Sequence, residues 1–419
     1  MSIREGYKQT EIGVIPEEWE LLELGNVADI LDPHPTHRAP KEDSNGYPFV
    51  GIGDISESGE INLSSCRKVS LEDVLEQNNN IAINENDIAF GRVATVGKVI
   101  KFKRYDFPFA LSPTMALIKS KSIKNEFLFQ FLNSGHTKNQ FRNFTSGSTR
   151  ISLGIQNLRK LLITFPPLPE QQKIAEILST VDQKIDSIDS KIEETQTLKR
   201  GLMQRLLSEG IGHSEFKESE IGRIPRVWEV VELKKIGQIV TGSTPKTSNQ
   251  EYYTNGTRLW ASPSDLGKSK EVKNTANKLT DLGFEQTRIL PARSILVTCI
   301  GSTIGKIGMA YEEMSTNQQI NSLVCTKENS PDFYYYVLDM KKEYIKNLAG
   351  TQAVPLLNKS DFSVIKVPLP PLEEQQKIAE ILSTTDEKLE TLRAKKEAFK
   401  TLKKGLIQKL LSGEVRVNA

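Results

Sequence analysis

The chain has 419 residues and a mass of 47.0 kDa, which is too long for one ordinary core, because domains usually hold about 100–200 residues. Apolar residues make up 37% and charged residues 26%, enough apolar material for packed cores and unlike a disordered or fibrous chain. The net charge of +2 does not by itself predict a polyanion partner.

Neither export nor membrane insertion is expected. No run of about 18 apolar residues occurs, and the opening MSIREGYKQTEIG lacks the apolar stretch of a signal peptide. The three cysteines, Cys66, Cys299 and Cys325, are far apart and form no CxxC pair. A disulfide framework or a zinc site is therefore not expected, and a cytoplasmic location fits.

Residues 1–165 are predicted to form a first globular domain. From Tyr7 it opens with YKQTEIGVIPEEWELLEL. Short β-rich runs follow at Ile88–Val93 and Lys98–Phe102, and NEFLFQFLNS predicts a helix. Strands and helices of this kind favour an α+β fold.

Residues 166–209 are predicted to form one long helix, PPLPEQQKIAEILSTVDQKIDSIDSKIEETQTLKRGLMQRLLS onward from Pro166. Pro169 suits the first helical turn, where its missing N–H is not needed. Apolar residues recur at alternating steps of four and three, which places them on one coiled-coil seam. The predicted seam is Ile174, Leu178, Val181, Ile185, Ile188, Ile192, Leu202 and Leu206, with Thr195 and Lys199 as polar members.

Residues 210–369 are predicted to form a second α+β domain like the first. From Phe216 it opens with FKESEIGRIPRVWEVVEL, a close match to the stretch at Tyr7. β-rich runs occur at Ser294–Ile300 and Ile307–Tyr311, and DFYYYVLDMKKEYI predicts a helix.

Residues 370–412 repeat the long helix, and residues 413–419 form a short tail. PPLEEQQKIAEILSTTDEKLETLRAKKEAFKTLKKGLIQKLLS matches the first helix without a gap and at well over half of its positions. The second seam is Ile378, Leu382, Leu389, Leu392, Phe399, Leu406 and Leu410, with Thr385, Lys396 and Lys403 as polar members.

The whole chain therefore reads as a tandem duplication of a domain followed by a helix. Polar seam positions differ between the copies, since Ile192 corresponds to Lys396, and this favours pairing of the two helices with each other. We expect two pseudo-repeated globular domains separated by two long helices that form an antiparallel coiled coil. In the alternative, each helix packs only on its own domain. Gly201 and Gly405 recur inside the helices and indicate close backbone packing or a kink.

Catalytic motifs are weak. STIGKIG from Ser302 has neither the glycine spacing nor the following Ser or Thr of a phosphate-binding loop. Asp332, Asp339 and Lys341 imitate the PD…DxK pattern of metal-dependent nucleases, but the stretch between them reads as one face of a helix. His34 and His37 have no accompanying carboxylate or thiol cluster. We expect no metal and no active site in this chain.

The repeated PPLxEQQKIAEIL segment, each copy behind a variable domain that opens with IGxIPxxW, resembles the specificity (S) subunit of type I restriction–modification enzymes. The resemblance covers essentially the full length. It implies that each globular domain is a target-recognition domain that reads one half of a bipartite, asymmetric DNA site. It also implies that the paired helices set the spacer length and dock the methyltransferase subunits, and that this subunit is not catalytic.

The resemblance further implies the partners: double-stranded DNA, two methyltransferase (modification) subunits and restriction/translocase subunits. S-adenosylmethionine for adenine-N6 methylation, and ATP and Mg for the endonuclease, are expected on those partners, with no cofactor bound by this chain. The isolated chain is expected to bind DNA weakly and in a salt-sensitive way. Four residues inserted into one helix are expected to change the gap between half-sites without changing either half.

Candidate DNA contacts lie in polar loops that differ between the two domains, because variable loops on a constant frame are typical of recognition modules. In the first domain they are Thr36, His37, Arg38, Arg92, Thr95, Lys98, Arg142, Ser146, Ser148 and Arg150. In the second they are Ser243, Thr244, Lys246, Ser302, Thr303, Lys306, Gln318, Gln319, Asn321, Thr351 and Gln352. A solvated or turn-capping role is the alternative for each, above all in the repeated turns ATVGK and STIGK.

Two other functions remain open from the residues alone. One is a scaffold whose coiled coil tethers two protein-binding domains without DNA. The other is a nuclease that uses Asp332, Asp339 and Lys341.

Overall fold

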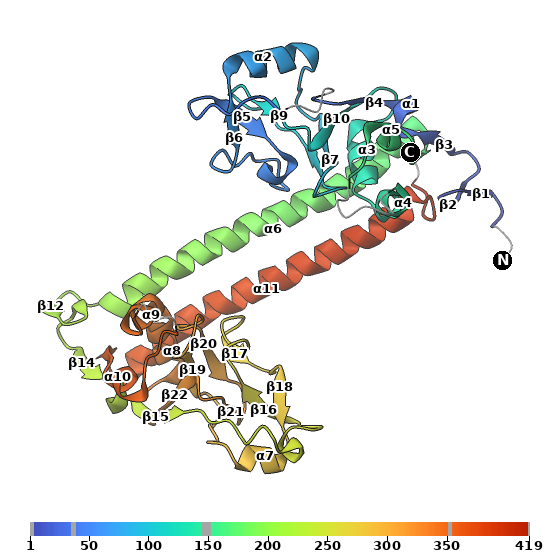
Figure 1. Cartoon of the computed structure of the whole chain (residues 1–419). Coiled ribbons are helices and arrows are strands. Elements are labelled where there is room, and N and C mark those ends of the chain that lie inside the picture. Colours follow the sequence, from blue (N-terminus) through green and yellow to red (C-terminus); the bar gives the residue numbers. More distant parts are fainter. Residues whose placement is uncertain (1–3, 35–38, 145–151, 351–353, 418–419) are drawn as a thin grey trace. The chain divides into compact units, whose positions relative to one another are not determined.

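A computed structural model describes residues 4–34, 39–144, 152–350 and 354–417, and the chain divides into two compact units (Figure 1). The first unit comprises residues 1–189 and 395–419, and the second comprises residues 190–394. Each unit therefore contains one globular domain and one end of each of two long helices. In the described ranges, no helix is long and apolar enough to cross a bilayer.

The globular domain of the first unit is built from small sheets and short helices. A four-stranded antiparallel sheet has the order β4-β10-β7-β8, and a three-stranded sheet has the order β6-β5-β9, with β5 and β9 parallel. The strands are β1 (Tyr7–Thr10), β2 (Gly13–Pro16), β3 (Glu20–Glu23), β4 (Ala28–Leu31), β5 (Tyr47–Val50), β6 (Arg67–Val69), β7 (Ile88–Gly91), β8 (Val99–Lys101), β9 (Ala110–Leu111), β10 (Met115–Ser120) and β11 (Leu162–Phe165). The helices are α1 (Leu24–Val27), η1 (Ile52–Asp54), α2 (Leu71–Asn80), α3 (Asn125–Leu132), α4 (Gly135–Phe144) and α5 (Ile155–Arg159).

The globular domain of the second unit repeats this plan. Its larger sheet has the order β15-β22-β19-β20-β17, and its three-stranded sheet has the order β18-β16-β21. The strands are β12 (Phe216–Ser219), β13 (Gly222–Pro225), β14 (Glu229–Glu232), β15 (Gly237–Thr241), β16 (Arg258–Ala261), β17 (Glu271–Val272), β18 (Asn277–Leu279), β19 (Ile295–Thr298), β20 (Ile307–Ala310), β21 (Ser315–Thr316), β22 (Ile320–Cys325) and β23 (Lys366–Leu369). The helices are η2 (Leu233–Lys235), η3 (Gln250–Tyr252), α7 (Asp281–Glu285), α8 (Pro331–Met340), α9 (Lys342–Leu348) and α10 (Lys359–Ser363).

The sequence predicts the class and the main elements correctly. The four predicted β-rich runs correspond to β7, β8, β19 and β20, and the first predicted helix is α3. The second predicted helix is in fact two, α8 and α9, which meet at Lys341. The domains are α+β and pseudo-repeated, because β4-β10-β7-β8 and β15-β22-β19-β20 match strand for strand.

The two long helices are α6 (Leu168–Glu209) and α11 (Leu372–Leu411), and in each unit their segments run antiparallel. In the first unit Asp189 pairs with Lys396 at 2.5 Å. Seven residues earlier on α6, Asp182 pairs at 2.6 Å with Lys403, which is seven residues later on α11. In the second unit Lys199 pairs with Asp386 at 2.6 Å. Lysines that interrupt the apolar seam thus meet aspartates of the opposite helix.

Part of the predicted seam is buried and the rest is half-buried. The buried members are Ile174, Leu178, Val181, Ile188, Leu206, Ile378, Leu382, Leu389 and Leu410. The half-buried members are Ile185, Ile192, Leu202, Leu392, Phe399 and Leu406. The expectation of close packing at Gly201 and Gly405 is wrong, because a Cβ at either residue would meet no atom within 4 Å.

The repeated motifs meet where each helix begins. Trp19 is fully buried, and its Nε1 donates to Glu170 in the first turn of α6 at 2.8 Å. Trp228 in the second unit is also fully buried, and its Nε1 donates to Glu374 in the first turn of α11 at 2.9 Å. IGxIPxxW and PPLxEQQ therefore recur together because the tryptophan of one fixes the glutamate of the other.

The far end of the other helix completes each of these contacts. In the first unit the tail residue Arg416 donates to Glu170 at 2.7 Å. In the second unit His213, which follows α6, lies 2.8 Å from Glu374. A glycine at positive φ leads into each connection, and a Cβ on Gly413 would lie 2.4 Å from Pro16. Each globular domain is thereby attached to the start of one long helix and the end of the other.

Candidate nucleic-acid interface

A polar loop cluster lies at one end of the larger sheet in each domain. In the second domain it comprises residues 241–246, the turn 316–319 and Arg288. The loop leaves β15 beside the turn that enters β22, because the amide of Gly242 donates to the Ile320 carbonyl and that of Ser243 to the Thr316 carbonyl. A Cβ on Gly242 would lie 2.0 Å from the Asn317 carbonyl oxygen. Only glycine allows this close approach of loop and turn.

Side chains of the second-domain cluster hold one another in place. The Thr244 hydroxyl donates to the Gln318 side chain, and the Ser243 hydroxyl accepts from the Arg288 amide at 3.1 Å. The Arg288 guanidinium donates to the Thr241 carbonyl at 2.7 Å. Thr244, Gln318 and Arg288 are exposed. The cluster therefore offers hydroxyl, amide and guanidinium groups, the kinds of side chain that hydrogen-bond to base edges and phosphates.

The turn between β19 and β20 approaches the same cluster. The Cys299 amide donates to the Gln319 carbonyl at 2.8 Å, and the Gly301 amide donates to the Pro355 carbonyl at 2.9 Å. Ser302 and Lys306 in this turn are exposed, and Thr303 is half-buried. Exposed Lys246 lies in the loop after β15.

The equivalent cluster of the first domain has different side chains. The loop after β4 contains Asp32 and His34, and His34 Nε2 lies 2.9 Å from the carbonyl oxygen of Leu111, where β9 ends. The turn that enters β10 contains Ser112 and Thr114, whose hydroxyls lie 2.5 Å apart. The exposed Thr95 belongs to the turn between β7 and β8. The two domains thus present different polar groups on the same frame.

Three predicted contacts serve the interior of the domains instead. Arg92 is 7% exposed, and its guanidinium donates to Asp32 and to the Leu153 carbonyl, each at 3.1 Å. Lys98 Nζ donates to the carbonyls of Ile52 and Ile55.

Asn321, the third of these, is 3% exposed and accepts from the Thr241 hydroxyl at 2.7 Å. The polar groups of Arg92, Lys98 and Asn321 are thus buried or already bonded within their domains, which favours the structural alternative for these three residues over DNA contact.

Several other predicted contacts are not placed by the structure. Outside the described residues lie Thr36, His37, Arg38, Ser146, Ser148, Arg150, Thr351 and Gln352. Arg142 lies on α4, but its side chain is outside the described part.

Sequence reasoning missed Arg288 and Asn317. Arg288 joins the loop after β15 although it is 45 residues from Ser243 in the chain. Asn317 donates to the Gln319 side chain at 3.0 Å and so orients that side chain. Gln318 and Gln319 were predicted as DNA contacts and do lie in this turn, but no pattern in the sequence indicated Arg288.

Asp332 and Asp339, which imitate a nuclease pattern in the sequence, both lie on α8. Asp332 pairs with Lys270 at 2.9 Å and also with Arg293, so cations of the domain occupy its carboxylate. Asp339 lies two helical turns further along α8. No group of three potential metal ligands occurs in the described ranges. Asp332 is therefore engaged by Lys270 and Arg293 within its own domain.

Replacement of His34 tests the polar packing of the first-domain cluster. Burial lowers the pKa of His34 below its usual value near 6.5, so the unfolded chain takes up this proton at higher pH than the folded domain. Stability linked to His34 is therefore complete above about pH 6.5 and is lost as the pH falls. We expect the thermal midpoint of the wild type to fall more than that of His34→Asn between pH 7.5 and 5.5. Equal falls would contradict this.

Comparisons with known proteins agree with this architecture. The family profile described as "Type I restriction modification DNA specificity domain" matches residues 16–197 and 225–400. The chain is 31% identical to the putative type I restriction enzyme MjaX specificity subunit of Methanocaldococcus jannaschii, over 99% of this chain and 97% of that protein. It is 29% identical to the MjaVIII specificity subunit of the same organism, over 99% and 96%.

A solved structure has the same fold. The type I restriction–modification S subunit from M. genitalium matches 98% of each chain with a TM-score of 0.58 and 16% identity. The duplicated domains, the antiparallel helix segments and the two profile matches agree. The chain therefore belongs to the type I restriction–modification DNA specificity family, as a specificity subunit with two DNA target-recognition domains.

Proposed function

We propose that each recognition domain reads one half of a bipartite, asymmetric DNA site through its loop cluster, and that the helix pair sets the number of unread base pairs. The single observation that carries this proposal is that the two domains share the same arrangement of strands but have different side chains in the loops beside the larger sheet. Asp32 and His34 in one domain stand where Thr241 and Ser243 stand in the other, beside the same sheet. Two domains with the same frame but different loop side chains would therefore read different half-sites.

The chain supplies recognition, and its partners supply chemistry. We infer that two modification subunits dock on the long helices and methylate adenine at N6 with S-adenosylmethionine. Restriction subunits would add ATP- and Mg-dependent translocation and cleavage. Three half-buried seam residues, Ile185, Ile192 and Leu392, support this docking, because they leave apolar surface for helices of a partner. The complex would work in the cytoplasm, where chromosomal DNA lies.

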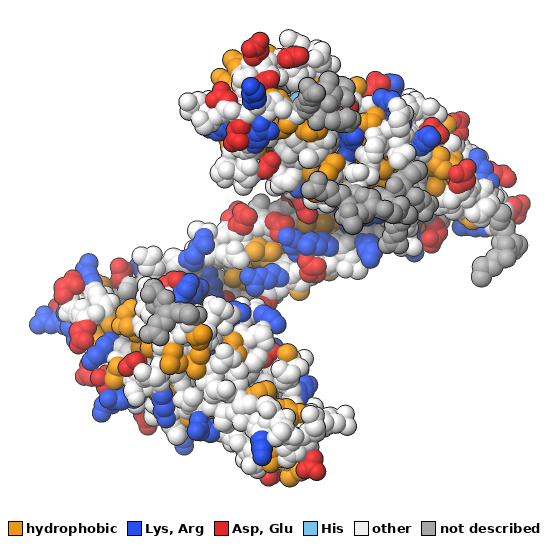
Figure 2. Space-filling model, in the orientation of Figure 1, with side chains coloured by type: hydrophobic (Ala, Val, Ile, Leu, Met, Phe, Trp, Pro, Cys, Tyr) orange, Lys and Arg blue, Asp and Glu red, His pale blue; other side chains and the backbone are white. Residues whose placement is uncertain are grey.

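Electrostatics support a complex over an isolated DNA binder. Figure 2 shows Lys and Arg side chains mixed with Asp and Glu over the visible face of the second domain. With a net charge of only +2, the chain offers little excess positive charge to phosphates. Partner subunits would supply the remaining attraction.

The test is adenine methylation by the chain together with its modification subunit, in a host that lacks other adenine methylation. We expect one bipartite, asymmetric motif in the methylated sites. The double variant Thr244→Ala/Gln318→Ala should relax bases in one half only, because each lost base contact weakens discrimination by about 5- to 150-fold. Exposed Lys217, on β12 and outside the cluster, supplies the control Lys217→Ala, which should leave the motif unchanged. Absence of a motif would indicate a scaffold without DNA specificity.

A further inference from the structure

In the first unit Asp182 joins three helices. Its Oδ1 lies 2.6 Å from Nζ of Lys403, so α6 is paired with α11. Its Oδ2 accepts from Nε2 of Gln130 on α3 at 2.8 Å, so α6 is also bonded to the recognition domain. Gln130 is 2% exposed. One carboxylate thus connects both long helices to the domain that they carry.

In the second unit Asp386 does the same with the long helices exchanged. Its Oδ1 lies 2.6 Å from Nζ of Lys199 on α6, and its Oδ2 accepts from the Tyr336 hydroxyl on α8 at 2.7 Å. Burial, followed by the Asp386 charge, raises the pKa of Tyr336, so the phenol stays protonated and donates. Tyr336 and Gln130 are each the sixth residue of their helix.

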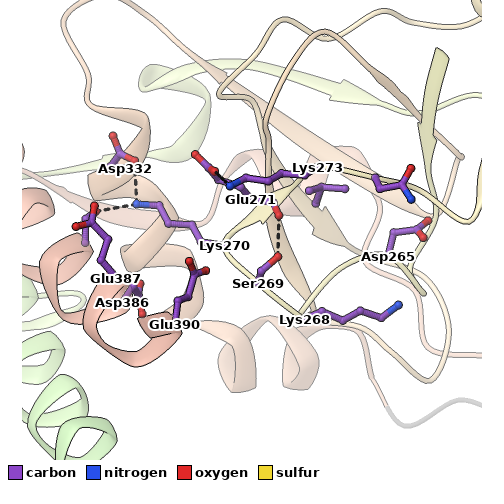
Figure 3. Close-up of a pocket in the computed structure, with 13 residues that line it drawn as sticks. Asp265, Lys268, Ser269, Lys270, Glu271, Lys273, Asp332, Asp386, Glu387 and Glu390 are labelled. Carbon is purple, nitrogen blue, oxygen red and sulfur yellow. Dashed lines mark hydrogen bonds and ion pairs between the residues drawn. The ribbon is translucent and has the colours of Figure 1, made fainter. Parts of the chain in front are cut away.

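A loop of the second domain reinforces this connection. Lys270 donates to the Ser383 hydroxyl of α11 at 2.9 Å and pairs with Asp332 of α8 at 2.9 Å. Its Nζ also lies 4.6 Å from the centre of the Tyr336 ring. Figure 3 shows Lys270 directed toward Asp332, with Asp386 on the neighbouring helix. The contacts of Asp386 therefore sit inside a larger polar junction between domain and helix.

We propose that Asp182 and Asp386 are positioning residues that hold each recognition domain at a fixed angle on the helix pair, and so make the complex selective for one spacer length. The inference rests on the proposed function. A domain that can rock on its helices brings its loop cluster to half-sites at more than one separation. A carboxylate bonded to both neighbours, with side-chain exposures of only 21–30%, opposes that motion.

The chain contains a matched control. Asp189 forms the third such interhelix pair, with Lys396 at 2.5 Å. In the described part of the chain, no side chain of a globular domain is hydrogen-bonded to it. Asp189→Asn therefore removes the same kind of ion pair between the same helices and leaves the attachment of the domain intact.

The experiment measures methylation of three DNAs by the full complex, with the wild-type spacer and with spacers one base pair shorter and longer. Asp182→Asn and Asp386→Asn should raise the rate on the altered spacers, relative to the natural one, by about tenfold, equivalent to about 1.4 kcal/mol of lost discrimination. Asp189→Asn should not. Thermal midpoints are recorded alongside, because a merely structural role lowers them without changing spacer preference.

The outcomes distinguish a failure of the positioning role from a failure of the proposed function. If the wild type methylates no bipartite site, the proposed function fails. If it does, and both variants keep wild-type spacer preference, the positioning role alone is refuted. Tyr336→Phe, which keeps the Lys199–Asp386 pair and removes only the hydroxyl that bonds Asp386 to α8, should relax spacer preference as Asp386→Asn does. Wild-type spacer preference in that variant would also count against the proposal.

Discussion

Replacing Trp228 by alanine should lower the free energy of unfolding of the second unit by about 3–5 kcal/mol. The ring is fully buried, so its loss leaves a cavity next to Ile224 and Leu233 in the same core. Its Nε1 also donates to Glu374, whose side chain is only 12% exposed. The carboxylate would lose a donor where water does not readily replace it. Calorimetry of the full chain should show a lower midpoint for one unfolding transition.

The variant Trp228→Phe separates the two parts of this effect. Phenylalanine keeps one aromatic ring in the core and removes the N–H donor with the rest of the indole, so it leaves a smaller cavity than alanine and the loss should be smaller, about 1–3 kcal/mol. Trp19→Ala should produce the larger loss in the first unit, because Trp19 repeats the burial and the bond to Glu170. Equal shifts for the alanine and phenylalanine variants at 228 would contradict the cavity argument.

These tryptophans mark what the sequence predicts and what it does not. The repeats predict that IGxIPxxW and PPLxEQQ belong together, but not that they touch. Trp19 and Glu170 are 151 residues apart, and periodicity reports only neighbours within a helix or strand. The bond between Arg416 and Glu170 was even less predictable, because the two residues are 246 positions apart and the tail that contains Arg416 is not repeated in the sequence. Such contacts depend on the tertiary path of the chain.

The position of the helix seam could be predicted from the sequence, but the ion pairs formed by its lysines could not. Lys199, Lys396 and Lys403 were found as polar interruptions of an apolar heptad. Their partners, among them Asp386 and Asp182, lie off the apolar seam, and only the antiparallel register brings them together. Buried or half-buried polar pairs of this type specify register in coiled coils.

The candidate interface was the least predictable part. Composition did not distinguish Arg92, which is buried against Asp32, from Arg288, which is exposed in a loop cluster. Both are single arginines near turns. Arg92 follows β7, an inner strand of its sheet, and is bonded to Asp32 in the loop after β4 and to the Leu153 carbonyl. Exposure, and with it the capacity to read DNA, is set by tertiary packing.

Adding seven residues to both long helices should lengthen the unread gap by about three base pairs and leave both half-sites unchanged. The insertions belong after Ile192 in α6 and after Leu392 in α11, between the pairs Asp189–Lys396 and Lys199–Asp386. Seven residues extend a helix by about 10 Å, and base pairs stack about 3.4 Å apart. A whole heptad also preserves the seam. Mapping of methylated adenines measures the gap directly.

Lengthening α6 alone should instead abolish methylation, which revises the expectation from sequence that one helix suffices. Ion pairs lie on both sides of Ile192, and each globular domain holds the start of one helix and the end of the other. One longer helix must then bulge or break a pair. The double insertion should itself methylate DNA more slowly than the wild type. Three added base pairs rotate the far half-site by about a third of a turn about the DNA axis. A heptad, in contrast, returns the recognition domain to nearly the same face of the helix pair, so the domain does not follow that rotation. An unchanged gap, or altered bases in either half, would show that the helix pair does not measure the DNA.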